Sequence, residues 1–178
     1  MVTKLTPFYR VLDKNKEGYT LFIDKEEERV YKSIHSPSNQ VVFWVLFFLT
    51  IILLRSFVSV HIPIENTLSL IGFLILEAII GIAVGRFIYK YYYKNITEVF
   101  YPPATIENYI QRGRKSLKIE LGVAIGIFIV YIISIALFVY DKWLIWNILS
   151  LFLISLLSIT LCALPIHRFK LYQKRNDS

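Results

Sequence analysis

The sequence predicts an all-α membrane protein, a four-transmembrane-helix bundle with a small N-terminal cytoplasmic β-hairpin arm. Four apolar blocks hold 75 of the 178 residues but only two of the 33 charged side chains (20 basic, 13 acidic), and they cover residues 41–54, 68–88, 121–139 and 144–164. A helix needs about 20 apolar residues to cross a bilayer. A soluble domain instead mixes its charges along amphipathic elements. The two charged residues inside the blocks are Glu77 and Arg86, and Arg86 lies at the cytoplasmic rim.

Charge and cysteine content narrow the class further. The net charge of +7 is compatible with a nucleic-acid partner, but the expected topology of a membrane protein accounts for it. We therefore expect the lipid bilayer as a partner and no nucleic acid. Cys162 is the single cysteine and cannot form an internal disulfide. No cysteine–histidine spacing indicates a ligand set, so we expect neither a metal nor another cofactor.

The N-terminal arm is predicted over residues 1–39. Segments 8–12 and 19–23 are rich in β-branched and aromatic residues, and polar turn residues separate them, which predicts a hairpin. Segment 30–34 is either a third strand or the end of a continuous helix over 24–34, because the charged residues before it favour helix by propensity. A sheet this small needs a covering surface on one face.

The transmembrane domain is predicted over residues 40–166. Its four helices are expected at about 40–60, 67–91, 116–140 and 143–165. Only Asp141 and Lys142 separate the last two helices, which predicts a tight antiparallel hairpin. A cytoplasmic loop at 94–115 joins the second and third helices, and a short interfacial helix is expected within it, over 105–112.

The distribution of lysine and arginine predicts the orientation. The arm, the loop between the second and third helices with the adjoining helix ends, and the tail at 167–178 together carry 18 of these 20 residues, whereas the two opposite loops with their rims carry Arg55 and Lys142. Cytoplasmic loops are enriched in lysine and arginine, so both termini and the middle loop are expected in the cytoplasm. The first 40 residues lack the pattern of a signal peptide, which makes the first block an internal start-transfer helix.

Glu77 is the candidate binding residue with the sharpest signal. It is the tenth residue of the 21-residue second block, near mid-membrane. An acid at that depth costs about 2.5–3.5 kcal/mol, and the aliphatic and phenylalanine residues of the block return about 4–8 kcal/mol, so the helix inserts regardless. An intramembrane acid serves either as hydrogen-bonded glue between helices or as an ion, proton or partner site.

Arg55 is a candidate partner of this acid. Counting the helical rise from the outer ends, Glu77 lies about 13 Å deep and Arg55 about 7 Å deep. The arginine either reaches Glu77 or extends outward to water, and the second arrangement costs less. Thr50, Tyr131 and Ser155 lie near the depth of Glu77 and are candidate neutral hydrogen-bond partners.

Two GxxxG motifs add four candidate binding residues, Gly81 and Gly85 in the second block and Gly122 and Gly126 in the third. Such spacing lets two helix backbones approach closely in a membrane. Both motifs lie near the predicted cytoplasmic ends, so we expect them to meet across the second and third helices, with a homodimer contact as an alternative. The spacing of four also places Glu77 on the stripe of Gly81 and Gly85, facing protein.

Motifs of known enzymes are missing from the sequence. It contains no HExxH, GxSxG, phosphate loop or intramembrane pair of acids. An intramembrane enzyme needs at least two catalytic groups at one depth, and Glu77 is the one such group. We therefore expect a protein without enzymatic activity and without catalytic residues.

The arm resembles the opening of a known family. Residues 7–12 read PFYRVL and residues 18–24 read GYTLFID. The tandem five-transmembrane proteins of Firmicutes open with a similar Pro-x-Tyr-Arg-aliphatic strand and a second aromatic strand ending in Asp. The resemblance implies a bacterial plasma membrane and, from some members, immunity against a membrane-depolarising toxin delivered by type VII secretion. This chain differs in its four predicted spans and in the charged segment that follows Asp24.

Two functions from different classes follow. The first is a non-enzymatic binding protein, with immunity against a membrane-active toxin as its concrete form. The second is a small transporter or channel subunit that uses Glu77 as an ion or proton site. Four helices with one buried acid are few for a monomeric transporter, so the second function requires a homo-oligomer.

Overall fold

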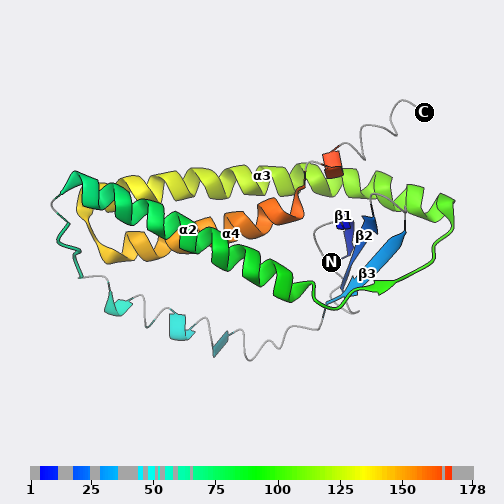
Figure 1. Cartoon of the computed structure of the whole chain (residues 1–178), viewed down its shortest axis with the longest axis horizontal. Coiled ribbons are helices and arrows are strands. Elements are labelled where there is room, and N and C mark those ends of the chain that lie inside the picture. Colours follow the sequence, from blue (N-terminus) through cyan, green and yellow to red (C-terminus); the bar gives the residue numbers. More distant parts are fainter. Residues whose placement is uncertain are drawn as a thin grey trace. The chain divides into compact units, whose positions relative to one another are not determined.

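The computed structural model describes residues 5–11, 18–24, 29–35, 44–45, 48–50, 52, 55–57, 60–64, 66–165 and 167–169. This part of the chain is mostly helical and combines long helices with an antiparallel sheet (Figure 1). The helices are α2 (Thr67–Tyr92), α3 (Pro103–Asp141) and α4 (Leu144–Ala163). The strands are β1 (Leu5–Val11), β2 (Tyr19–Asp24), β3 (Val30–Ile34) and β4 (Thr97–Glu98). The predicted first transmembrane helix, 40–60, lies mostly outside the described residues, as does most of the tail at 167–178.

The chain divides into two compact units. The sheet unit comprises Met1–Pro37, Ile88–Ala124 and Thr160–Ser178, and the helix unit comprises Ser38–Phe87 and Ile125–Ile159. Helices α2, α3 and α4 each contribute residues to both units. Each unit is described separately below.

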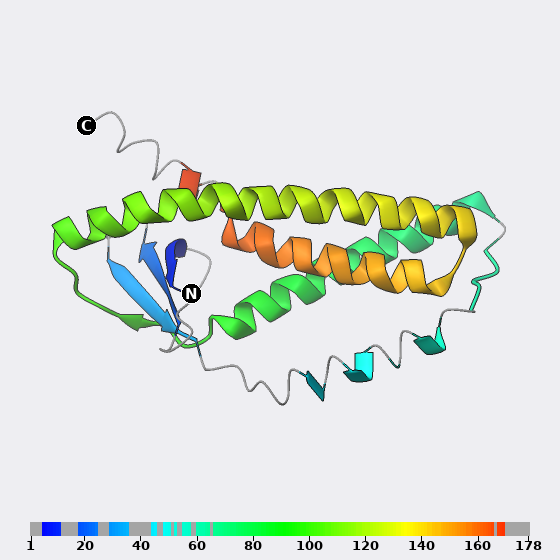
Figure 2. The same cartoon turned by 180° about the vertical axis from the view of Figure 1, so that it is seen from behind.

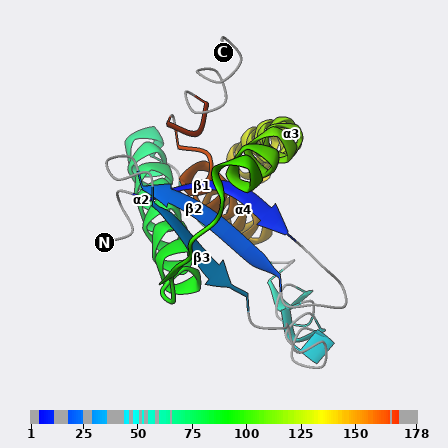
Figure 3. The same cartoon turned by 90° about the vertical axis from the view of Figure 1, so that its right-hand side faces the viewer.

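The sheet has the strand order β1-β2-β3-β4, and its neighbouring strands are antiparallel (Figure 3). The predicted hairpin is confirmed, and the segment at 30–34 is a strand rather than the end of a helix. Its residues Val30, Tyr31 and Ile34 are of the β-branched and aromatic types that favour strands, and strand pairing overrides the helix propensity of the charges before them. The two-residue strand β4 was not predicted, because its pairing with β3 depends on long-range geometry.

Both faces of the sheet are covered within the sheet unit. Leu21 and Phe22 are consecutive in β2 and therefore point to opposite faces, yet each is 0% exposed. The ring of Phe22 packs edge-on against Tyr93, which directly follows α2, at 5.2 Å between centroids. On the other side, Tyr9 of β1 lies 4.7 Å from Tyr109 in the first part of α3, which runs past the sheet (Figure 2). The chain thus supplies the covering surface that a small sheet requires.

Helix α3 corrects the predicted loop at 94–115. The helix begins at Pro103 and is 39 residues long, so the loop is shorter and the expected interfacial helix at 105–112 is its first part. Proline suits the first turn of a helix, and Gly113 alone costs only about 1 kcal/mol, too little to break it. The polar and apolar parts of α3 also share one buried stripe that recurs every seven residues, at Ile110, Leu117, Ala124, Tyr131 and Phe138.

The turn between α3 and α4 confirms the predicted tight hairpin. Lys142 adopts the left-handed conformation, with φ of 55°, and α4 starts two residues later. Backbone hydrogen bonds attach the segment at 60–62 to this turn, from Ile62 N to Lys142 O and from Leu144 N to Val60 O, both at 2.9 Å. The turn that joins α3 and α4 is therefore hydrogen-bonded to the segment at 60–62.

All three described long helices are long and apolar enough to cross a membrane. The shortest, α4, has 20 residues and spans about 30 Å, the thickness of the hydrocarbon core. Many large apolar side chains on the outer surfaces of α2 and α3 are exposed, including Leu68, Ile79, Ile129 and Ile133. A soluble protein would bury such surfaces, whereas a bilayer solvates them.

Candidate functional site

The candidate site centres on Glu77, which lies on the buried stripe of α2. This carboxyl is only 6% exposed, and Gly81 and Gly85 are buried on the same stripe. Residues four apart share one face of a helix, and here that face packs against α4. The prediction that Glu77 faces protein alongside these two glycines is confirmed.

Two residues of α4 bind the carboxyl group of Glu77. The side-chain amide of Asn147 donates a hydrogen bond to Oε2 at 2.6 Å, and the hydroxyl of Ser150 donates to Oε1. The hydroxyl of Ser150 also lies 2.8 Å from the backbone carbonyl of Asn147. Asn147 and Ser150 are three residues apart and therefore project from one side of α4. Both Glu77 oxygens are thus satisfied by uncharged donors from the neighbouring helix.

The glycines of α2 allow α4 to approach closely enough for these bonds. A Cβ added at Gly81 would collide with the side chain of Ile154, and one at Gly85 would collide with the backbone carbonyl of Ser155. Farther along the same seam, the hydroxyl of Ser158 donates to the carbonyl of Ile82 at 3.1 Å. Close backbone approach and a hydrogen bond between helices are the two means by which membrane helices associate. We call this contact, from Glu77 to Gly85, the α2–α4 seam.

The second GxxxG motif does not join this seam, which corrects the expectation that the two motifs meet. A Cβ added at Gly122 or Gly126 would meet no described residue within 4 Å, and both glycines are exposed on α3. The glycines of α2 face α4, whose Asn147 and Ser150 donate hydrogen bonds to Glu77 on the same stripe. We call the exposed surface around Gly122 and Gly126 the glycine face of α3.

Two of the predicted partners, Arg55 and Ser155, do not bind Glu77. Arg55 is exposed, and among the described residues no ion pair joins it to Glu77. The hydroxyl of Ser155, one of the suggested neutral partners, donates to the Leu151 carbonyl at 2.8 Å instead. Sequence reasoning missed Asn147 because it chose the neutral partners by their estimated depth in the membrane. A signal was present, since Asn147 is the one asparagine or glutamine in the four apolar blocks.

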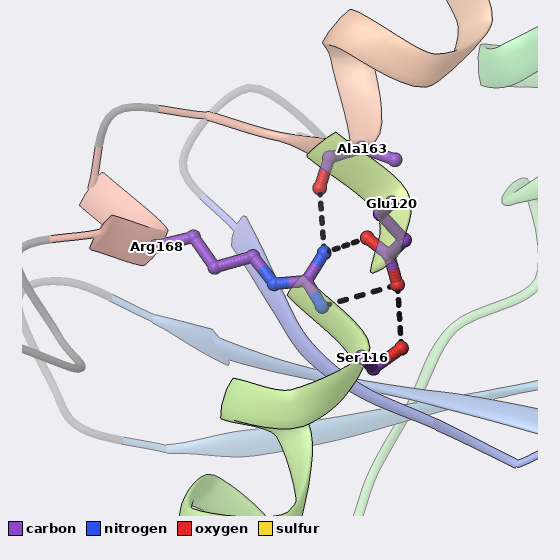
Figure 4. A network of polar contacts seen from close by, with 4 residues as sticks. All are labelled: Ser116, Glu120, Ala163 and Arg168. Atoms are coloured by element: carbon purple, nitrogen blue, oxygen red, sulfur yellow. Dashed lines mark hydrogen bonds and ion pairs between the residues drawn. The ribbon is translucent and has the colours of Figure 1, made fainter. Parts of the chain in front are cut away.

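A second polar cluster lies in the sheet unit, where Arg168 reaches Glu120 of α3 (Figure 4). The guanidinium is 3% exposed and contacts both carboxylate oxygens, with Nη1–Oε2 at 2.5 Å and Nη2–Oε1 at 3.3 Å. Nη1 also donates to the carbonyl of Ala163 at 3.1 Å, at the end of α4, and Ser116 donates to Glu120 at 2.9 Å. Arg168 therefore attaches the segment at 167–169 to α3 and caps α4 at once.

His35 is the buried titratable residue of the arm. Its Nε2 lies 2.9 Å from the hydroxyl of Thr20, and its ring stacks on Tyr92 at 5.0 Å. Burial, and secondarily the positive charge of Arg10, lower the pKa of His35. A neutral imidazole between aromatic rings fixes the end of β3 next to the end of α2 and carries no evident chemistry.

The described polar groups of the helix unit support helix association rather than bond-breaking chemistry. In the part of the chain that the structure describes, no group of three or more His, Cys, Asp or Glu residues is placed to hold a metal ion. Glu77 has two neutral partners, and the nearby serines bond to backbone carbonyls. Comparisons with protein-family models, with curated proteins and with solved structures found no match to this chain.

Proposed function

We propose that this protein is a non-enzymatic, multi-pass membrane protein that binds a membrane-active protein and thereby neutralises it. The observation that carries the proposal is the glycine face of α3. Gly122 and Gly126 lie in a helix apolar enough to cross a membrane, and none of the residues that the structure describes lies within 4 Å of a Cβ added there. The GxxxG motif of α2 packs against a helix of the same chain. We infer that the matching motif of α3 packs against a helix of another protein.

The chemistry of the neighbouring side chains supports a hydrophobic partner. Val123 and Ile125 lie beside the glycines and are exposed, and the nearby Ile129 is exposed as well. An apolar helix that crosses or enters the bilayer matches this surface. The resemblance of the arm to the tandem five-transmembrane family gives the partner its concrete form, a depolarising toxin that acts on the plasma membrane.

The proposed topology has four spans, with the first at 40–60, and both termini in the cytoplasm. The three described apolar helices support multiple passes. The division of lysine and arginine, 18 against 2, supports the cytoplasmic location of the arm, the loop and the tail. A depolarising toxin would act in the same bilayer in which α3 presents its glycine face.

The hydrogen bonds of Glu77 weaken the alternative of a transporter or channel subunit. A transport site must exchange its ion or proton with water on both sides of the membrane. Glu77 is buried, and Asn147 and Ser150 bind both of its oxygens. This geometry supports the interpretation of Glu77 as glue between helices.

The proposal is tested in cells that produce the depolarising protein encoded beside this gene. Co-production of the chain is expected to preserve the membrane potential, measured with a potential-sensitive dye. The double variant Gly122→Leu/Gly126→Leu is expected to lose protection, because two isobutyl groups prevent close approach of a partner helix.

The matched control is the double variant Val123→Leu/Ile125→Leu, which changes exposed neighbours but leaves both glycines. It is expected to protect like the unchanged chain, and all three proteins are expected at equal levels in the membrane fraction. Equal protection by the glycine variant contradicts binding at the glycine face, and no protection by the unchanged chain contradicts the immunity role.

A further inference from the structure

Four tyrosines that are distant in sequence gather in the sheet unit. They come from β1, from the start of β2, from the segment before α3 and from the second turn of α3, and we call them the tyrosine cluster: Tyr9, Tyr19, Tyr101 and Tyr109. Tyr109 is at the centre, because its ring lies 4.7 Å from that of Tyr9 and 5.8 Å from that of Tyr101. Tyr19 and Tyr109 lie close enough for Tyr109 to affect the ionisation of Tyr19.

A positive charge lies at the same place. The ammonium group of Lys32 in β3 is 4.5 Å from the ring centroid of Tyr19. The strand register explains this position, because Tyr9 is opposite Leu21 and Leu21 is opposite Lys32, so the three side chains share one face of the sheet. Among the described acids, Glu98 of β4, the strand next to β3, is paired with Arg29 at 3.6 Å.

The phenol groups are in a suitable state to donate hydrogen bonds. Burial and, after it, the neighbouring phenols of the cluster raise the pKa of Tyr19, so its hydroxyl keeps its proton at neutral pH. All four tyrosines are half-buried, which leaves part of each side chain accessible. Tyr101 also lies two residues before the first turn of α3, a helix end that carries a partial positive charge and has no acidic residue in that turn.

We propose that the tyrosine cluster and Lys32 form a binding site for a phosphate group, presented by an anionic lipid headgroup or by free phosphate. Phenol hydroxyls donate hydrogen bonds to phosphate oxygens, and Lys32 and the helix end supply positive charge. An aromatic cluster also attracts organic cations, but the ammonium of Lys32 repels them here. Glu107 is two residues from Tyr109, so it projects from another side of α3 and does not oppose the anion. The inference is independent of the proposed immunity role.

Two measurements on the purified full-length chain distinguish the two sources. In a neutral detergent, equilibrium dialysis measures binding of radiolabelled inorganic phosphate. In nanodiscs of mixed phosphatidylglycerol and phosphatidylcholine, mass spectrometry of the lipid retained after extraction measures headgroup preference. Lys32→Gln removes the charge, and Tyr19→Phe/Tyr109→Phe removes two hydroxyls but keeps both rings and the packing of the sheet.

Each change is expected to weaken binding by about tenfold, the effect of losing a hydrogen bond or a charge at an anion. The matched controls are Lys94→Gln, an exposed lysine near the same sheet, and Tyr91→Phe/Tyr140→Phe, two exposed tyrosines outside the cluster. Phosphate retention that is lost in both test variants assigns a free phosphate, and phosphatidylglycerol preference lost in both assigns a headgroup. No binding in either measurement, or equal loss in the controls, overturns the proposal.

Discussion

Helices α2 and α3 both carry a GxxxG motif. The motif of α2 is packed against α4, whereas the motif of α3 is exposed. Helix α4 lies so close to Gly81 and Gly85 that an added Cβ at either position would collide with it, whereas a Cβ at Gly122 or Gly126 would meet none of the described residues within 4 Å. The two motifs have the same spacing and similar apolar neighbours. They differ in what shares their stripe, because Glu77 precedes the α2 motif by four residues and needs hydrogen-bond donors.

This difference indicates that Glu77 determines which helix packs against α2, whereas Gly81 and Gly85 allow that helix to come close. In a bilayer, apolar side chains gain little by leaving lipid for protein, so packing and hydrogen bonds decide which helices associate. Asn147 and Ser150 on α4 are the donors that Glu77 binds. At the corresponding position, four residues before Gly122, α3 has Lys118, which is exposed. The following predictions test this comparison in order of decreasing effect.

The largest effect is expected from filling the α2–α4 seam with Gly85→Leu. At this position an added Cβ lies 2.6 Å from Cβ of Ser158 and collides with the Ser155 backbone, so α4 must move away. We expect a loss of about 3 kcal/mol in the free energy of unfolding, the upper range for overpacking. The measurement is unfolding by increasing SDS in mixed micelles, followed by circular dichroism. Gly126→Leu is the matched control on the exposed motif of α3 and is expected to leave stability unchanged, so equal losses in the two variants contradict the comparison.

A smaller effect is expected from removing a donor while the glycines stay. Asn147→Leu leaves a buried oxygen of Glu77 without its amide partner, and we expect a loss of about 2 kcal/mol. In the double variant Glu77→Leu/Asn147→Leu both polar groups are gone, and the total loss is expected to fall below the sum of the two single losses by at least about 1 kcal/mol. The free energy of unfolding is again measured by unfolding in SDS, followed by circular dichroism. Strict additivity would show that the hydrogen bond does not hold the seam.

The smallest effect concerns the far end of the seam. Ser158→Ala removes the hydrogen bond from Ser158 to the carbonyl of Ile82, and we expect a loss of about 0.6 kcal/mol, typical of such bonds between membrane helices. Ser69→Ala, at an exposed position of α2, serves as the control and is expected to change nothing. A loss as large as that of Asn147→Leu would indicate that the polar contacts of the seam are equivalent, against a dominant role for Glu77.

The sequence predicted the features that depend on local composition. The apolar blocks predicted α2 and α4 to within two residues at each end, the aromatic segments predicted β1 and β2, and the two-residue turn before α4 followed from block spacing. The start of α3 was wrong because a polar helix that packs on a sheet has no apolar signature. Its seven-residue stripe, from Ile110 onward, would have been the better guide.

The site was predicted only in part. The sequence indicates that a buried acid such as Glu77 requires hydrogen-bond donors, but it does not indicate which residues supply them. Glu77 and its stripe followed from spacing and hydropathy. The roles of Asn147 and Ser150 depend on which helix packs against the stripe of Glu77, Gly81 and Gly85. That helix is α4, so the expectation that this stripe meets the glycines of α3 was wrong. The pair of Glu120 and Arg168 was missed for the same reason, because each residue taken alone is a common charge at a membrane edge.

That pair has a consequence for the order in which the chain is completed. Glu120 and Arg168 are 48 residues apart, so a growing chain exposes Glu120 on α3 long before the residue that neutralises it is made. Glu120 is paired, and the end of α4 capped, only after Arg168 has been synthesised. A chain that stops before this residue leaves Glu120 without its arginine partner. The attachment of the segment at 167–169 to α3 is therefore made late, when α2, α3 and α4 have all been synthesised.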